Sequence, residues 1–225
     1  MPTVLLVRHA QASFGSDDYD VLSPTGVEQA EVVSTALARR ELNVTRLVSG
    51  PARRQLDTAA PVAAALGRAV ATDERWDEYM TEEIVSTHGQ AEASLAGTGS
   101  GGEQITSRQF QEVIDVALES WVQAGAEGPA AQLWPDFLGS RKAALAELAG
   151  ALGSGEVGVA VTSGGVIAAI AADLLGHHDL FPRLNRVLVN TGITKLAVGR
   201  SGLSLVSYNE HAHLDDGGGQ LLTYR

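Results

Sequence analysis

Short apolar runs, each about the length of a β-strand, recur near both ends of the chain. The first of them, residues 4–7, has valine at both ends and stops at an arginine and a histidine. Apolar runs of roughly four to eight residues that are rich in β-branched side chains favour buried strands. Further predicted strands cover residues 43–48, 69–72 and 157–162. Near the end of the chain, residues 187–198 and 203–208 flank an Arg-Ser-Gly turn, which predicts a closing hairpin.

Apolar residues at helical spacing follow several of these strands. A first helix is predicted to begin near Gly26 and to end near residues 39–40, which are basic. Its apolar positions are Val27, Ala30, Val33 and Leu37. A second helix, residues 51–66, opens on a proline, which fits a first turn, and stops at Gly67. A third, strongly apolar helix is predicted over residues 165–175.

Strand–helix units at both ends of the chain, with a helical segment between them, indicate the α/β fold class. We expect a three-layer α/β/α sandwich with a mainly parallel sheet and helices on both faces. The length of 225 residues fits a single domain, residues 1–225, that carries an insertion. The insertion covers approximately residues 82–151 and includes a Gly/Ser-rich segment at 97–102. It is predicted to cap the carboxyl edge of the sheet.

Composition restricts the partners that this chain is expected to have. An apolar content of 44% is that of an ordinary globular protein. The net charge is −11, from 16 basic and 27 acidic residues, which argues against nucleic acid and anionic membranes as partners. Cysteine is absent from the sequence, which excludes disulfides and thiolate catalysis. With no signal peptide or membrane span predicted, a cytoplasmic location is expected.

Arg8 and His9 come directly after the first predicted strand. In open α/β sheets, ligands bind at the carboxyl ends of the strands. Arginine offers a planar fork of donors that matches phosphate, and histidine is a nucleophile or base near neutral pH. The pair therefore predicts an anion site, although a solvated strand edge is the commoner role of such a pair.

Three further segments lie at predicted strand ends. Arg54 and Thr58 share one face near the start of the second helix, where backbone N–H groups favour an anion. Glu78 follows a tryptophan and precedes a tyrosine, and aromatic packing raises the pKa of a carboxyl group. Residues 162–165 lead from a strand through two glycines into a helix, a turn that can present N–H groups to phosphate. The alternatives are an exposed basic helix face, a solvated acidic turn and an ordinary strand–helix connection.

The motif Arg8-His9-Ala10 is followed at residues 22–30 by Leu-Ser-Pro-Thr-Gly-Val-Glu-Gln-Ala. This order resembles the histidine phosphatase superfamily, the phosphoglycerate-mutase-like group of phosphatases and mutases. The corresponding family patterns are Arg-His-Gly and Leu-Thr-x-x-Gly-x-x-Gln-Ala.

Later segments extend the resemblance over the whole chain. Residues 51–59 are similar to the family's Pro-Leu-x-Arg-Ala-x-Gln-Thr-Ala, which places its second arginine at Arg54 rather than Arg53. Glu78 stands where the acid of the Leu-x-Glu motif falls, and residues 208–214 are similar to a tail seen in many members. As a set in this order, the motifs imply the family's fold and chemistry.

The resemblance implies a phosphatase that hydrolyses a small phosphorylated metabolite. His9 attacks phosphorus and forms a phosphohistidine, which water then hydrolyses. Arg8 and Arg54 stabilise charge on the phosphoryl oxygens, and Glu78 protonates the leaving oxygen and then activates water. No cofactor or metal is expected, and a homodimer is left open. The resemblance also implies phosphate or substrate binding by Gln11, Ser13, Ser23, Ser163 and Gly164.

One position departs from the family pattern. The family has Ser-His-Gly-Gly where this chain has Thr162-Ser163-Gly164-Gly165, so Ser163 stands in place of the second catalytic histidine. Serine donates one hydrogen bond but carries no positive charge. The loss of one such donor costs on the order of 10²–10³ in rate. His211 and His213 are candidate substitutes.

Two hypotheses of different classes follow. The first is a phosphatase acting through phospho-His9, with its rate reduced by the loss of the histidine at Ser163. The second is a catalytically impaired phospholigand-binding or scaffold protein on the same fold. A mutase is a less favoured third, because it must protect the phosphoenzyme from water and reposition its product. The sequence does not specify the substrate, and aromatic residues of the insertion such as Trp121 and Trp134 are expected to serve packing.

Overall fold

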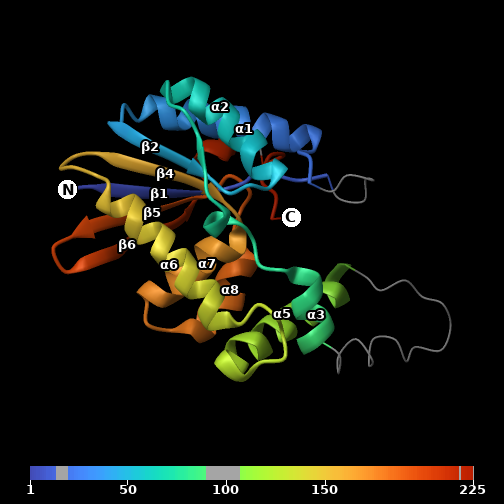
Figure 1. The fold of residues 1–225 in the computed structure, drawn as a ribbon. Coiled ribbons are helices and arrows are strands. Elements are labelled where there is room, and N and C mark those ends of the chain that lie inside the picture. Colours follow the sequence, from blue (N-terminus) through green and yellow to red (C-terminus); the bar gives the residue numbers. More distant parts are fainter. Residues whose placement is uncertain (14–19, 90–106, 218, 225) are drawn as a thin grey trace.

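A computed structural model describes residues 1–13, 20–89, 107–217 and 219–224 (Figure 1). It contains a six-stranded sheet in the order β3-β2-β4-β1-β5-β6. Strands β1, β2, β3 and β4 pair in parallel, whereas β5 is antiparallel to both β1 and β6. The strands are β1 (Thr3–Arg8), β2 (Val44–Ser49), β3 (Ala71–Thr72), β4 (Val157–Thr162), β5 (Ile193–Gly199) and β6 (Gly202–Glu210).

Helices cover both faces of this sheet, as expected for an α/β sandwich (Figure 1). Helices α1 and α2 lie on one face and α6, α7 and α8 on the other, while α3 and α5 extend beyond the sheet. The α-helices are α1 (Pro24–Arg39), α2 (Arg53–Leu66), α3 (Thr81–His88), α5 (Ser107–Ala124), α6 (Trp134–Gly150), α7 (Gly164–Leu174) and α8 (Phe181–Val187). The 3₁₀ helices are η1 (Glu74–Trp76), η2 (Gly125–Glu127), η3 (His178–Leu180) and η4 (Ala212–Gly217). Within the described ranges, no helix is long and apolar enough to cross a membrane.

Strand β1 divides its side chains between two hydrophobic cores. Val4 and Leu6 pack into the core beneath α6 and α7, whereas Leu5 and Val7 face the core formed with α1 and α2. Successive side chains of a strand point to opposite faces, so a strand buried on both faces is apolar throughout. This burial fixes the position of β1 and, with it, the place where Arg8 and His9 leave the sheet.

The observed elements differ from the sequence-based expectations in several places. Val27 is 54% exposed, because α1 begins at Pro24 and buries the neighbouring Gly26 and Ala30. Pro51 precedes α2 instead of opening it, while Gly67 ends that helix in the left-handed conformation with φ +62°. Residues 187–192 were expected in the closing hairpin, but β5 starts at 193; Val187 ends the short helix α8, and residues 188–192 form a loop with a turn. The third strand is reduced to two residues.

The predicted insertion consists of helices α3, α5 and α6 among the described residues. The carboxyl end of α6 packs on the sheet, where Leu148 lies over Gly158 of β4. The predicted Gly/Ser-rich segment, 97–102, lies outside the described residues. Aromatic side chains of the insertion pack against one another and against α8. The ring centroids of Trp121 and Trp134 are 5.2 Å apart, and that of Phe181 in α8 is 4.8 Å from Trp134. Because these rings are buried, they serve packing, as expected.

The parallel strands β1, β2 and β4 all end at the same edge of the sheet. Arg8 of β1 pairs in register with Thr162 of β4, and Ser49 of β2 pairs with Val161. The residues that follow each strand therefore converge at this carboxyl edge. In this way the topology brings together motifs that are far apart in the sequence.

Candidate active site

His9 lies just beyond the end of β1, and its two ring nitrogens have different partners. Nδ1 is 2.7 Å from the carbonyl oxygen of Ala10, and Nε2 is 3.3 Å from Nε of Arg54. A carbonyl oxygen only accepts hydrogen bonds, so Nδ1 carries the proton. Nε2 then holds a lone pair that accepts from the Arg54 guanidinium. The geometry leaves Nε2 as the basic and nucleophilic atom of the ring.

The surroundings of His9 keep its imidazole neutral. The side chain is only 8% exposed, and burial lowers its pKa well below the usual value, with further lowering by the charges of Arg8 and Arg54. A protonated imidazole has no lone pair at Nε2 with which to attack phosphorus. The neutral ring is therefore the form that a nucleophile requires.

The backbone around His9 is held from two sides. The N–H of Ala10 donates to Oγ1 of Thr58 at 2.9 Å, and Oγ1 of Thr58 donates to the carbonyl of Arg54 at 2.7 Å. On the opposite side, the Asn190 side-chain amide donates to the carbonyl of His9 at 3.1 Å. Thr58 was predicted to share a helix face with Arg54, whereas the sequence analysis did not identify Asn190. These bonds fix the direction of the imidazole before a ligand binds.

Arg8 is anchored by main-chain carbonyl groups from distant parts of the chain. Its NH1 donates to the carbonyl oxygen of Leu188 and, at 2.7 Å, to that of Tyr224. The carboxyl-terminal residues thereby contact the candidate site. They are themselves held because the side chain of Gln29 donates to the carbonyl of Leu221 at 2.7 Å.

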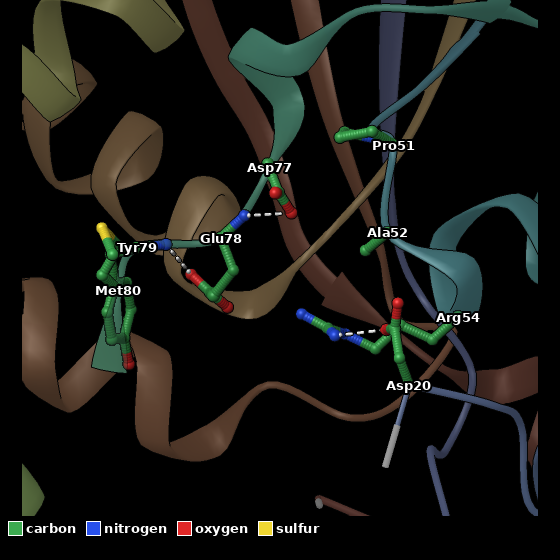
Figure 2. A pocket seen from close by; sticks show the side chains of 8 residues that line it. All are labelled: Asp20, Pro51, Ala52, Arg54, Asp77, Glu78, Tyr79 and Met80. Carbon is green, nitrogen blue, oxygen red and sulfur yellow. Dashed lines mark hydrogen bonds and ion pairs between the residues drawn. The ribbon is translucent and has the colours of Figure 1, made fainter. Parts of the chain in front are cut away.

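Arg54 forms an ion pair that the sequence did not predict. NH1 of Arg54 lies 2.5 Å from Oδ1 of Asp20, whose other oxygen accepts from the N–H of Arg53 at 2.7 Å. Figure 2 shows the Arg54 side chain extending into the pocket with Asp20 beside it. Asp20 belongs to a polar loop with several acidic residues, and no motif or spacing distinguishes it from the others.

Glu78 stands on the other side of the pocket, in the segment between η1 and α3. Its carboxylate accepts from the N–H of Gly165 at 3.2 Å and from the N–H of Tyr79 at 3.1 Å (Figure 2 shows the latter). Burial raises the pKa of Glu78, although the charges of Arg54 and Arg8 and both hydrogen bonds act in the opposite direction. A carboxyl group with a raised pKa is suited to act as a general acid.

Glycine is required at position 165 by the approach of Glu78. A Cβ atom at this position would lie 2.2 Å from Oε1 of Glu78 and 2.3 Å from the Tyr79 ring. The strand–Gly–Gly–helix pattern predicted that this turn offers its N–H groups to phosphate. In the structure the Gly165 N–H instead binds the Glu78 carboxylate.

We expect Gly165→Ala to lower the free energy of unfolding by about 1–3 kcal/mol, the usual cost of overpacking. It should also reduce turnover, because the methyl group displaces Glu78. Urea denaturation and steady-state kinetics measure both effects. The matched control is Gly139→Ala in α6, where a Cβ would meet nothing within 4 Å. That variant should gain roughly 0.5–1 kcal/mol, and equal stability of the two variants would contradict the prediction.

Ser163 lies between β4 and α7 and is fully buried, at 0% exposure. Its Oγ accepts a long hydrogen bond of 3.4 Å from the side-chain amide of Gln55. The same amide donates to the carbonyl of Trp76 at 3.2 Å. The position therefore supplies no positive charge, and its hydroxyl is engaged by a neighbour that the sequence analysis did not single out. The next residue, Gly164, comes close to the Arg8 guanidinium: a Cβ there would lie 3.4 Å from Nε.

The remaining predicted binding residues lie on the loop that follows β1. Ser23 caps α1 by accepting from the N–H of Gly26 at 3.0 Å, and its hydroxyl donates to Gln11 at 2.8 Å. The N–H of Ser13 donates to the carbonyl of Val21 at 2.8 Å. The structure thus joins Gln11 to Ser23 and ties Ser13 to the opposite side of the loop. Their roles toward a substrate stay predictions.

The two candidate substitute histidines have partners on the other side of the His9 loop. His213 Nε2 lies 3.2 Å from Oγ1 of Thr191, and burial lowers the pKa of His213 to about 4. His211 Nδ1 lies 2.6 Å from the carbonyl of Asn209. Since neither bond involves Ser163 or His9, the structure gives no contact through which these histidines replace the missing one.

A pocket of about 380 Å³ opens beside these residues (Figure 2). Its lining residues are Asp20, Pro51, Ala52, Arg54, Asp77, Glu78, Tyr79 and Met80. Arg54 and Glu78 line the pocket, and the Arg54 guanidinium joins it to the buried neutral imidazole of His9. Arg8 lies at the end of β1, next to His9 in the chain. Such a set can bind a phosphoryl group, attack it and protonate a leaving oxygen.

Solved structures share this architecture over nearly the whole chain. A phosphoserine phosphatase mutant from Entamoeba histolytica, in complex with phosphoserine, is 21% identical, with 95% of this chain and 100% of that chain covered and a TM-score of 0.68. A mycobacterial glucosyl-3-phosphoglycerate phosphatase in complex with VO3 is 23% identical, with coverages of 93% and 99% and a TM-score of 0.64. A protein described as mycobacterial hydrolase 1 is 24% identical, with coverages of 93% and 99% and a TM-score of 0.65. At these identities the likeness shows the fold.

The chain therefore has the fold of the histidine phosphatases, with the motif residues gathered at the carboxyl edge of its sheet. Residues 4–96 match the family model of the histidine phosphatase superfamily (branch 1). This match supports the resemblance to that superfamily over the first part of the chain, and the solved structures share its fold. A comparison with curated protein sequences gives no match.

Proposed function

We propose that the protein is a phosphomonoesterase that acts on a small phosphorylated metabolite through a phosphohistidine at His9. The observation that carries the proposal is the state of His9, a buried neutral imidazole whose Nε2 faces the Arg54 guanidinium. Arg8 and Arg54 would hold the phosphoryl oxygens, since a guanidinium binds phosphate in a forked geometry. The phosphatases among the solved structures of the same fold support this reaction class.

The reaction would proceed in two steps. In the first, Nε2 of His9 forms a bond to phosphorus while the bond from phosphorus to the leaving oxygen breaks, and the Glu78 carboxyl gives its proton to that oxygen. In the second, the Glu78 carboxylate removes a proton from water as the water oxygen attacks phosphorus. The phosphorus–nitrogen bond then breaks and releases phosphate. Positioning and charge stabilisation supply most of the catalysis in such transfers.

The primary test is hydrolysis of p-nitrophenyl phosphate by the purified protein. We expect release of p-nitrophenol with saturation kinetics and inhibition by vanadate, which mimics phosphate in transfer. Absence of turnover over the range of pH 4–9 would contradict the proposal.

The rate should depend on pH in a direction set by Glu78. The acid must be protonated to serve an alkyl leaving group, and its pKa is raised. Hydrolysis of an alkyl phosphate should therefore be fastest at low pH and fall as pH rises through the raised pKa of Glu78. Protonation of His9 also stops attack, and because its pKa is lowered this loss occurs at lower pH than for an ordinary histidine. Measurement of kcat/KM against pH for ethyl phosphate tests this. In Glu78→Gln the fall in rate with rising pH should disappear. If the fall persisted in this variant, it would be caused by the titration of another group.

A second candidate function is binding of a phospholigand without turnover. It is favoured by Ser163, which is buried and hydrogen-bonded to Gln55, so that no charged side chain stands at this position. It predicts that inorganic phosphate or vanadate binds in calorimetry while aryl phosphate is not hydrolysed. Turnover that is lost in His9→Ala would exclude it.

A further inference from the structure

The pocket beside His9 has an unusual balance of charge for a site that must bind an anion. Among its lining residues, Arg54 is basic and Asp20, Asp77 and Glu78 are acidic. The whole chain is also acidic, with a formal net charge of −11. Under the proposed function Arg54, which lines this pocket, and Arg8 hold the phosphoryl group. The charge of the remaining lining residues then acts on the rest of the substrate.

Asp20 is fixed against the wall by two bonds. Its Oδ1 is 2.5 Å from Arg54 NH1, and its Oδ2 accepts from the backbone N–H of Arg53 at 2.7 Å. Because Asp20 pairs with Arg54, the positive charge of that guanidinium is shared before a substrate enters. The other side of the Arg54 guanidinium faces His9, because Nε of Arg54 donates to Nε2 of His9. A second anionic group on the substrate would meet the Asp20 carboxylate and no additional cation among the lining residues.

Asp77 holds a second carboxylate in the pocket lining. Its Oδ1 accepts from the N–H of Glu78 at 2.8 Å, which fixes it at the start of the segment that carries the acid. Both carboxylates line the pocket, and Figure 2 shows Asp20 beside Arg54 and Asp77 apart from them, next to Glu78. A group that lies in the pocket would therefore be within reach of both carboxylates.

The leaving group is the part of the substrate that lies there. This step rests on the proposed function: Glu78 protonates the leaving oxygen, so the leaving group must be next to Glu78, which lines the pocket. The phosphoryl group would lie at the inner end, between His9 and the arginines. The charges of Asp20 and Asp77 then act on the alcohol portion of the substrate.

We propose that Asp20 and Asp77 determine specificity for phosphomonoesters whose alcohol portion is cationic or neutral, such as phosphorylated amino alcohols. Substrates that carry a carboxylate or a second phosphate on that portion are disfavoured. A single charge–charge interaction at about 6 Å in a partly hydrated pocket changes affinity by roughly ten-fold. Two carboxylates of this kind are enough to separate substrates of the same size but opposite charge.

Three two-carbon esters test the proposal, because they differ mainly in charge: phosphoethanolamine, ethyl phosphate and phosphoglycolate. We expect kcat/KM to fall in that order. Asp20→Asn should reduce the ratio of phosphoethanolamine to phosphoglycolate by about ten-fold. Comparison of this ratio between wild type and variant cancels the differences in intrinsic reactivity among the esters, because those differences are the same for both proteins.

Asp57→Asn is the matched control. It removes one carboxylate from the same helix region, but Asp57 pairs with the Arg53 guanidinium at 3.6 Å and does not line this pocket. The control should leave the ratio unchanged. Equal ratios in wild type and Asp20→Asn, or a preference of the wild type for phosphoglycolate, would overturn the proposal.

The test remains decisive if the proposed function fails. Turnover of p-nitrophenyl phosphate reports on the phosphatase itself, independently of the charge order. If no ester is hydrolysed, the dissociation constants of the same three compounds, measured by calorimetry, should still rise from phosphoethanolamine to phosphoglycolate. Loss of turnover would then refute the phosphatase, and a flat or inverted order of affinities would refute the charge selectivity.

Discussion

Replacement of His9 by alanine is expected to lower kcat for p-nitrophenyl phosphate by at least about 10³-fold. The variant has no side chain that can bond to phosphorus, and loss of a nucleophile typically leaves only the contribution of binding and charge stabilisation. The pocket itself should persist, because the backbone bonds of Thr58 and Asn190 to the His9 loop do not involve the imidazole. Steady-state kinetics measure the loss, and phosphate affinity should change much less.

A suitable control for that variant is His177→Ala. His177 is exposed, with a side-chain exposure of 69%, and contacts Asp179 at 3.7 Å. Its removal should leave kcat within about two-fold of wild type, since surface substitutions have small effects. If His9→Ala retained the wild-type rate, the reaction would not pass through this residue.

The second large effect is expected from Ser163→His, which should raise kcat by about 10²-fold. The substitution places a histidine at the start of α7, next to Gly164, where a Cβ would lie 3.4 Å from Nε of Arg8. Under the proposed function it supplies the missing charged donor to the phosphoryl group. A single donor at such a site contributes on the order of 10²–10³ in rate. The substitution removes the hydrogen bond from Gln55 to Ser163. Because this bond is long, at 3.4 Å, we expect its loss to contribute little to the change in rate.

Two measurements accompany Ser163→His. Ser163 is completely buried, so urea denaturation must establish that the larger side chain is accommodated. Ser163→Asn supplies a polar side chain of increased size without the positive charge and should show little gain. An unchanged rate in a folded Ser163→His variant would mean that another group already serves as the missing donor.

The candidate site residues that follow the strands could be predicted from the sequence. Arg8, His9 and Arg54 carry recognisable chemistry at positions where parallel strands or helix starts place functional groups, and the structure brings them together at the carboxyl edge. The aromatic neighbours of Glu78 left a solvated acidic turn as the alternative, and the resemblance to the Leu-x-Glu motif favoured the acid. In the structure Glu78 is half-buried and its pKa is raised, chiefly by burial. Local pattern and strand topology marked these residues as candidates, and the order of the motifs along the chain, through the family resemblance, selected them over the alternatives.

Other features depend on contacts that no local pattern encodes. Asp20 and Asn190 act through pairs separated by 34 and 181 positions. The partner of Ser163, Gln55, is 108 positions away. The strand expected from residue 187 starts only at 193, because the buried apolar residues Leu188 and Val189 lie in a loop whose turn places Thr191 at φ +60°. An apolar run alone does not distinguish such a buried loop from a strand. Tertiary packing, and not propensity, determines where β5 begins.

The central claim is that the phosphoryl group is transferred to His9 and forms a phosphohistidine. Detection of this phosphoenzyme tests the claim most directly. The protein is mixed with excess phosphoethanolamine, quenched in alkali within one turnover, and digested for mass spectrometry, because phosphohistidine is stable in base. The account predicts a phosphate on the peptide that contains His9, formed and lost at rates that match turnover, and absent from His9→Ala. Turnover without this modification, or with phosphate on a different residue, would contradict it.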